Sequence, residues 1–210
     1  MEAYQTEEQQ VEAIKSFWRE NGNSLIAGLV IGLGGFVGWN YYQDNQLQEQ
    51  YQAAYDYQQT MDAFASKQQD FRTQTQAFID NNSDKVYATF AAFALAQDAV
   101  EHQDYAEAAK QLQVAINATE SDNLKAIGNL RLARVQVQQG EYQAALTTLN
   151  AITLASFVAS VEEVKGDAYL LQGDKAQARA AYQAAADAGG LQASPALQMK
   201  LDDLAVSVAQ

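Results

Sequence analysis

The stretch that decides the fold of the first part of the chain is Asn21–Tyr42, NGNSLIAGLVIGLGGFVGWNYY. It lies within a run of 23 uncharged positions between Glu20 and Asp44. At about 1.5 Å per residue, a helix of that length reaches roughly 34 Å, enough to cross a bilayer core of about 30 Å. Aromatic residues flank the stretch on both sides, as is typical of membrane interfaces. They are Phe17, Trp18, Trp39, Tyr41 and Tyr42. The pattern predicts a transmembrane helix over 21–42; the alternative is a buried, glycine-rich core helix of a soluble protein.

The basic residues near this stretch predict its orientation. Lys15 and Arg19 precede it, whereas the next basic residue after it is Lys67. The positive-inside rule therefore predicts a cytoplasmic tail over 1–20 and a domain over 43–210 on the far side of the membrane. A cleaved signal peptide would need a shorter apolar region followed by small residues, and the aromatic exit of this stretch offers no such cleavage pattern.

Glycines within the stretch predict a helix-packing face. Gly28, Gly32 and Gly35 fall on one side of a helix, and Gly34 and Gly38 are also four positions apart. Glycine at this spacing lets another helix backbone approach closely within a bilayer. The alternative is that these glycines reflect only the ordinary composition of membrane helices.

The composition excludes several function classes. The chain has 210 residues and a formal net charge of −13 at pH 7. Such an acidic chain is a poor partner for nucleic acid, which requires basic patches. The chain contains no cysteine, so it has neither a disulfide framework nor a thiolate metal site.

Beyond the membrane stretch, the sequence predicts helix nearly throughout. The whole chain has one proline, and Ala and Gln are abundant. Gln43–Ser66 reads as a Gln-rich helix continuous with the membrane anchor or close to it. Ala54, Tyr57, Met61 and Phe64 form an apolar stripe on that helix.

A repeated pattern predicts how the later helices are organised. Three similar segments are Gln103–Ala108, Gly140–Ala145 and Gly173–Ala178. Their alignment places Ala108, Ala145 and Ala178 in one register, 37 and 33 residues apart. The positions four residues later hold Leu112, Leu149 and Tyr182, and those twelve residues earlier hold Ala96, Ala133 and Gly166. This alternation of small and large residues resembles the tetratricopeptide repeat, whose period is about 34 residues. It predicts an all-α solenoid of helical hairpins, with an irregular helical bundle as the alternative.

The two ends of the solenoid carry weaker signals. A degenerate first repeat over Gln50–Asn81 would place Gln74 and Phe78 at the aligned positions. At the other end, Asp187–Ala193 reads as a turn into a capping helix that Ser194 and Pro195 begin. Its apolar face is predicted from Leu197, Leu201, Leu204 and Val208.

The sequence carries no recognisable catalytic or metal-binding motif. His102 is the only histidine, and without cysteine it cannot form a usual His-based metal site or nucleophile–base pair. The prediction is a non-enzymatic protein without a cofactor or metal.

Two groups of side chains are candidates for binding a peptide or protein partner. Arg131 and Arg134 share one helix face and could hold an acidic peptide end, although such pairs also bridge to neighbouring carboxylates. Tyr87, Phe90 and Phe93 pose the same question: they are expected mostly in the core, although one of them could line the groove that a tetratricopeptide solenoid offers to peptides.

The chain resembles a known family in three segments. They are Gln10–Phe17 in a short acidic tail, the glycine-rich span that ends at Gly38 and Trp39, and Asn123–Val137 in the repeat region. Together they resemble the YfgM family, ancillary subunits of the bacterial SecYEG translocon. The resemblance covers essentially the whole chain.

The resemblance implies a single-pass protein of the bacterial inner membrane with a periplasmic domain. It also implies association with the translocon and with the membrane-anchored chaperone PpiD, and contact with translocating polypeptides. No catalytic residues follow from it. Two other hypotheses stay open: a membrane-anchored scaffold for another envelope complex, and an enzyme with an unrecognised site.

Overall fold

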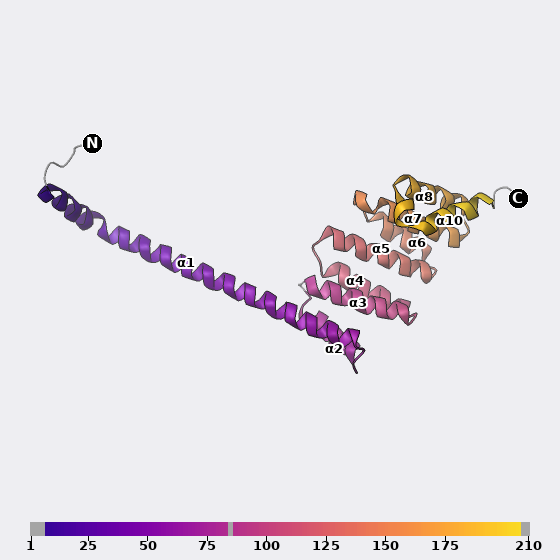
Figure 1. Ribbon diagram of the computed structural model, residues 1–210, viewed down its shortest axis with the longest axis horizontal. Helices are drawn as coiled ribbons and strands as arrows, with labels where there is room; N and C mark the ends of the chain where they lie inside the picture. The colour runs from indigo at the N-terminus through magenta and orange to yellow at the C-terminus, as the bar shows by residue number, and fades with distance from the viewer. Residues whose placement is uncertain (1–6, 84–85, 207–210) are drawn as a thin grey trace. The chain divides into compact units, whose positions relative to one another are not determined.

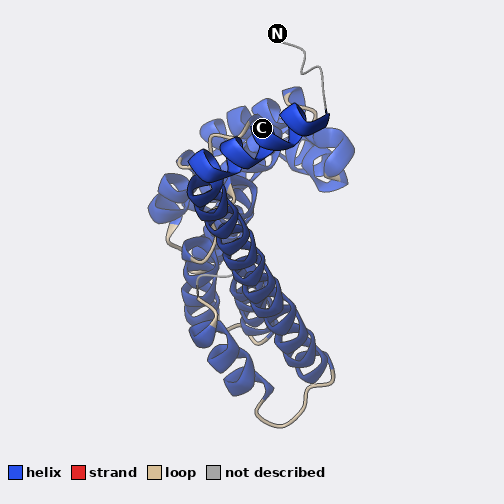
Figure 2. Cartoon of the chain, turned by 90° about the vertical axis from the view of Figure 1, so that its left-hand side faces the viewer, coloured by secondary structure: helices blue, strands red, loops and turns tan. Residues whose placement is uncertain are grey.

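The architecture is helical. A computed structural model describes residues 7–83 and 86–206; the first six residues of the predicted cytoplasmic tail and Val208 lie outside the described residues. Figure 2 shows that the regular structure of the described ranges is all helix, which confirms the predicted all-α class. The chain divides into two compact units, Met1–Gln52 and Ala53–Gln210, which are described separately below.

The described residues of the first unit lie within the long helix α1 (Glu7–Ala65), which has 59 residues (Figure 1). This helix is long and apolar enough to cross a membrane, and only 6% of its most apolar window is buried. Leu29 and Ile31, for example, are 63% and 75% exposed. A core helix of a soluble protein would hide such side chains inside the protein, so their exposure favours the membrane prediction. The predicted Gln-rich helix over 43–66 is the C-terminal part of the same helix.

The second unit contains helices that pack in consecutive pairs (Figure 1). The pairs are α3 (Val86–Glu101) with α4 (Tyr105–Asn117), α5 (Asp122–Gln138) with α6 (Tyr142–Asn150), and α7 (Val158–Gln172) with α8 (Lys175–Asp187). A short 3₁₀ helix, η1 (Ala155–Phe157), leads into α7. This pairing confirms the predicted solenoid of helical hairpins.

The turns inside the hairpins share one backbone conformation. Gly140 and Gly173 have φ values of 79° and 92°, the left-handed region that glycine adopts without steric cost. Gln103 holds the equivalent position in the α3–α4 turn with φ 61°. The next helix is then capped in two hairpins, where Asp104 and Asp174 accept backbone N–H groups three residues ahead.

The predicted repeat register is confirmed by burial. Ala108, Ala145 and Ala178 are each fully buried. The large side chains four residues later, Leu112, Leu149 and Tyr182, are at most 2% exposed. Small residues on the partner helices lie opposite them; at Gly166, for example, even a Cβ would lie 2.3 Å from the Tyr182 ring.

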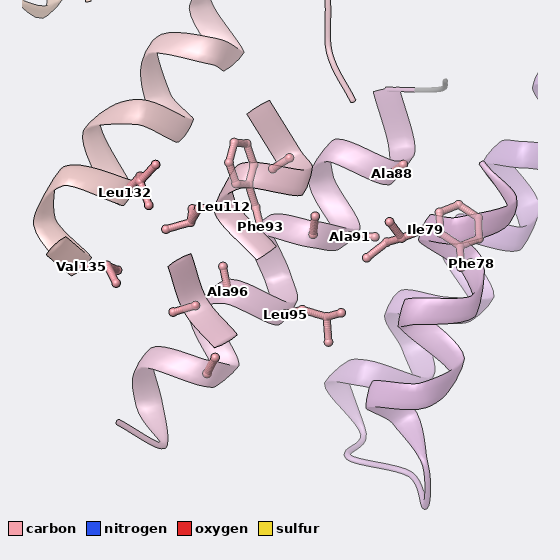
Figure 3. Packing of buried hydrophobic residues seen from close by; sticks show 14 residues of the cluster. Phe78, Ile79, Ala88, Ala91, Phe93, Leu95, Ala96, Leu112, Leu132 and Val135 are labelled. Atoms are coloured by element: carbon pink, nitrogen blue, oxygen red, sulfur yellow. The ribbon is translucent and has the colours of Figure 1, made fainter. Parts of the chain in front are cut away.

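The three interior clusters follow the pairs along the chain. Figure 3 shows the first, in which α3 packs between α2 (Phe71–Asn81) on one side and α4 and α5 on the other. Ala91 of α3 faces Ile79, whereas Phe93 lies near Leu112 and Leu132. The first cluster therefore extends from α2 through the α3–α4 hairpin to α5, the first helix of the next hairpin.

The first repeat differs from its prediction. Gln74 is exposed, and the neighbouring Thr75 takes the fully buried small position, so the predicted register is wrong by one residue. Large aromatic side chains join α1 to α2 here: the Phe64 and Phe71 rings meet edge to face at 5.1 Å. The predicted stripe is only half-buried, because Tyr57, Met61 and Phe64 pack against the edge of the first cluster. Spacing rules derived from small residues do not apply to such a contact.

The C-terminal end closes the solenoid. The predicted turn over Asp187–Ala193 contains a four-residue helix, α9 (Gly190–Ala193), before α10 (Pro195–Val206) begins. Leu197 and Leu204 of α10 are buried against α8, as predicted for a capping helix. The Ser194 hydroxyl donates to Glu163 at 3.0 Å, so it links α10 to α7.

Candidate functional site

A groove of about 650 Å³, which we call the inner groove, lies in the second unit. Its walls come mainly from α3, α5 and α7, the first helices of the three hairpins, with contributions from α4, α8 and α10. The lining includes Val100, Val137 and Leu170, which hold equivalent positions in the three hairpins. The repeat register therefore positions the inner groove.

The floor of the inner groove is apolar and partly uncovered. Val100 of α3 is 40% exposed and Leu171 of α7 is 56% exposed, and both line the groove. The buried Val135 and Val137 and the partly buried Leu170 also line the groove. Such a floor offers apolar contact area to a bound chain.

Two arginines of α5 stand on one wall of the inner groove. Arg131 and Arg134 are both exposed groove residues, so the structure brings together the pair predicted from sequence. The Arg131 guanidinium lies 4.8 Å from the centroid of the Phe93 ring. Neither arginine forms an ion pair with a carboxylate of the described residues, so the expected bridging to neighbouring acids is not found there. Both guanidinium groups retain free donors.

Another part of the lining is an internally satisfied polar network. Lys200 of α10 contacts Asp167 at 2.7 Å and Glu163 at 2.9 Å, and the Tyr182 hydroxyl donates to Asp167 at 2.7 Å. Burial, together with the hydrogen bond to Asp167, raises the pKa of the Tyr182 phenol. Burial alone would lower the pKa of Lys200, but the hydrogen bonds and charges of Asp167 and Glu163 outweigh it and raise that pKa. The two Lys200 contacts join α10 to α7.

One of the three candidate aromatics, Phe93, lines the inner groove beside Arg131, whereas the other two lie elsewhere. Neither Tyr87 nor Phe90 lines the inner groove. The Tyr87 ring stacks on Tyr57 with centroids 5.2 Å apart, and Phe90 is 39% exposed. The structure therefore does not place them with the arginine pair, and their role in partner binding stays a prediction.

A buried aspartate that the sequence reasoning missed organises the start of the solenoid. Asp98 of α3 is 2% exposed and accepts hydrogen bonds from Lys67 at 2.5 Å and Arg72 at 2.6 Å. His102 lies beside this group, with a ring nitrogen 3.8 Å from the Asp98 carboxylate. Burial alone would raise the pKa of Asp98, but the two cations hold it below its usual value. The sequence did contain a signal for this buried site: Asp98 is an acidic residue within the mostly apolar run Phe90–Val100.

The predicted glycine face of α1 is open. A Cβ built on Gly28, Gly32 or Gly35 would have no neighbouring atom within 4 Å. The backbone of α1 is therefore accessible to another helix along this face. Its role in helix packing stays a prediction.

Comparisons with known proteins agree on one kind of protein. The family model for a tetratricopeptide repeat-like domain matches residues 15–206. An Escherichia coli protein named ancillary SecYEG translocon subunit is 38% identical over 98% of this chain and 100% of its own length. Proteins with the same name from Haemophilus influenzae and Aggregatibacter actinomycetemcomitans are 33% and 34% identical, each over 94% of this chain and 97% of their own length. No solved structure matches the chain.

Proposed function

Because this chain belongs to the family of ancillary SecYEG translocon subunits, we propose that it is a non-enzymatic accessory subunit of the bacterial SecYEG translocon. The observation that carries the proposal is the extent of the similarity. It covers 98% of this chain and the full length of the Escherichia coli relative, so the membrane helix and the repeat domain match together.

The proposed topology places the protein once through the inner membrane. The tail over 1–20 is cytoplasmic, 21–42 crosses the bilayer, and the domain over 43–210 is periplasmic. Lys15 and Arg19 on one side of the span, against a long stretch without basic residues on the other, support this orientation.

The proposed contact with the translocon runs through the membrane. In a bilayer, helices associate through close packing and polar contacts, because lipid tails offer no hydrophobic drive. The face of Gly28, Gly32 and Gly35 allows close approach, since a Cβ at any of the three would have no neighbouring atom within 4 Å. A transmembrane helix of the translocon, or that of the chaperone PpiD, is the partner proposed for this face.

The proposed task of the exported domain is protein–protein interaction. Helical-hairpin solenoids present extended concave surfaces to partner chains. The inner groove supplies such a surface, with an apolar floor and two available guanidinium groups. Emerging polypeptides and the periplasmic part of PpiD are the proposed partners.

Detergent purification from membranes tests the proposal. Replacing both Gly28 and Gly32 by leucine keeps the span apolar, so membrane insertion should be normal, but the bulky side chains should hold a partner helix away. The variant should recover several-fold less SecYEG than the wild-type chain.

The chain contains its own matched control. Gly34→Leu with Gly38→Leu makes the same chemical change on a different face of α1 and should recover SecYEG normally. Equal recovery from both variants would place the contact elsewhere. Recovery of a different envelope complex in place of SecYEG would favour the scaffold hypothesis.

A further inference from the structure

We infer that the inner groove binds an acidic polypeptide segment with interspersed apolar side chains, held by its carboxylates on Arg131 and Arg134. The inference rests on the proposed function, which places this domain where polypeptides emerge from the translocon. It adds a ligand class and the two side chains that select it.

The charges of the inner groove point to an anionic ligand. Four charged residues line it: Arg131, Arg134, Asp167 and Lys200. Lys200 pairs with both Asp167 at 2.7 Å and Glu163 at 2.9 Å, so two carboxylates already offset its positive charge. The two arginines have no such partner among the described residues. The inner groove therefore presents two available positive charges within a domain that is acidic as a whole.

The arginines suit carboxylate in particular. A guanidinium can donate two parallel hydrogen bonds to one carboxylate, a geometry that lysine lacks. Arg131 lies over the Phe93 ring at 4.8 Å, which restricts its motion and leaves its edge donors available. Because part of its conformational freedom is already lost, binding a carboxylate costs less entropy.

The floor indicates that the ligand is a polypeptide with apolar side chains. Val100 and Leu171 keep 40% and 56% of their surfaces exposed beside the arginine wall. A volume of about 650 Å³ accommodates several side chains and is too small for a folded domain. Nucleic acid is a poor ligand, because the groove has an apolar floor and only two arginines within an acidic domain. A basic peptide segment would be repelled by the same two arginines.

Binding of labelled peptides to the full-length chain in lipid nanodiscs tests the inference. The acidic peptide carries Asp and Glu among Leu and Val. Two companions keep the Leu and Val and replace the acids by Asn and Gln or by Lys. Fluorescence anisotropy should show the acidic peptide binding about tenfold more tightly than the amide peptide, and the Lys peptide binding least.

A matched pair of variants assigns the effect to the arginines. Arg131→Gln with Arg134→Gln should weaken the acidic peptide about tenfold and leave the amide peptide unchanged. Lys175→Gln with Arg179→Gln removes the same charge from an exposed face of α8 outside the groove and should change binding little. Leu171→Ser should weaken both acidic and amide peptides, whereas Met199→Ser, exposed on α10 outside the groove, should not.

Three results would overturn the inference. They are equal affinity of the three peptides, equal weakening by the two charge-removing variants, and tighter binding of the Lys peptide than of the acidic peptide. Loss of peptide binding with normal SecYEG recovery in the Arg131→Gln, Arg134→Gln variant would support the inference independently of the membrane contact. Normal peptide binding in a chain that recovers no SecYEG would instead reject the proposed function alone.

Discussion

The ring of Tyr182 occupies the space that any side chain on Gly166 would need. A Cβ on Gly166 would lie 2.3 Å from Cε1 of Tyr182, far inside van der Waals contact. The ring is fully buried, and its hydroxyl is fixed by Asp167, so it cannot turn aside. This pair joins α7 to α8 through a glycine and an aromatic side chain, as the repeat register requires.

Gly166→Ala should therefore destabilise the exported domain by overpacking, by about 1–3 kcal/mol. Chemical denaturation followed by circular dichroism measures the loss. In a Tyr182→Leu background the same substitution should cost much less, because the ring that collides with it is gone. Additive effects of the two substitutions would contradict the assigned contact.

Asp98→Asn should cost about 2 kcal/mol, because it removes the charge that Lys67 and Arg72 contact inside the fold. The exposed Glu101→Gln on the same helix should stay within about 0.5 kcal/mol of the wild type. A comparable loss of stability from both variants would show that the contacts of Asp98 with Lys67 and Arg72 contribute no more than an exposed carboxylate does.

The pKa of Asp98 gives the wild-type chain a specific acid sensitivity. Its folded pKa is below the ordinary value of 3.8, so the unfolded chain binds a proton more readily. The stabilisation is therefore complete above about pH 3.8 and decreases as the pH falls through the folded pKa. Chemical denaturation at a series of acid pH values should show that Asp98→Asn loses less unfolding free energy than the wild type as the pH falls. The same pH dependence in both chains would contradict this assignment.

Gln103→Gly should stabilise the domain by about 0.5–1 kcal/mol. Gln103 has φ 61°, in the region where a residue with a Cβ carries a steric cost and glycine does not. The reverse change at Gly173, φ 92°, should destabilise by a similar or larger amount. A higher melting temperature for Gln103→Gly and a lower one for Gly173→Gln would confirm the shared turn conformation. A lower melting temperature for Gln103→Gly would contradict it.

Reporter fusions test the orientation. A reporter after Gln210 should be active only when it requires the periplasm, and one at the N-terminus only when it requires the cytoplasm. Replacing Lys15 and Arg19 by glutamine should weaken this bias, whereas Lys67→Gln should not. Cytoplasmic activity of the C-terminal reporter would reverse the topology.

The sequence predicted those parts of the fold that local patterns determine. The register of Ala108, Ala145 and Ala178 was predictable because small residues must recur where helices cross closely. The first repeat was not, because bulky aromatics such as Phe64 and Phe71 hold its helices and leave no small-residue signal.

The candidate site was predictable only in part. The shared face of Arg131 and Arg134 follows from helical spacing, but their freedom from nearby carboxylates depends on how α3, α5 and α7 meet. Asp98 was missed because its partners, Lys67 and Arg72, are 31 and 26 residues away in sequence. No local rule connects residues at such separations.

Photocrosslinking in living cells tests the central claim most directly. A photoreactive amino acid at Gly28 and, separately, at Gly34 samples two faces of the membrane helix. The account predicts crosslinks from position 28 to a SecYEG subunit or to PpiD, and weaker ones from position 34. Crosslinks from both positions to lipid alone, or to proteins of another envelope complex, would contradict it.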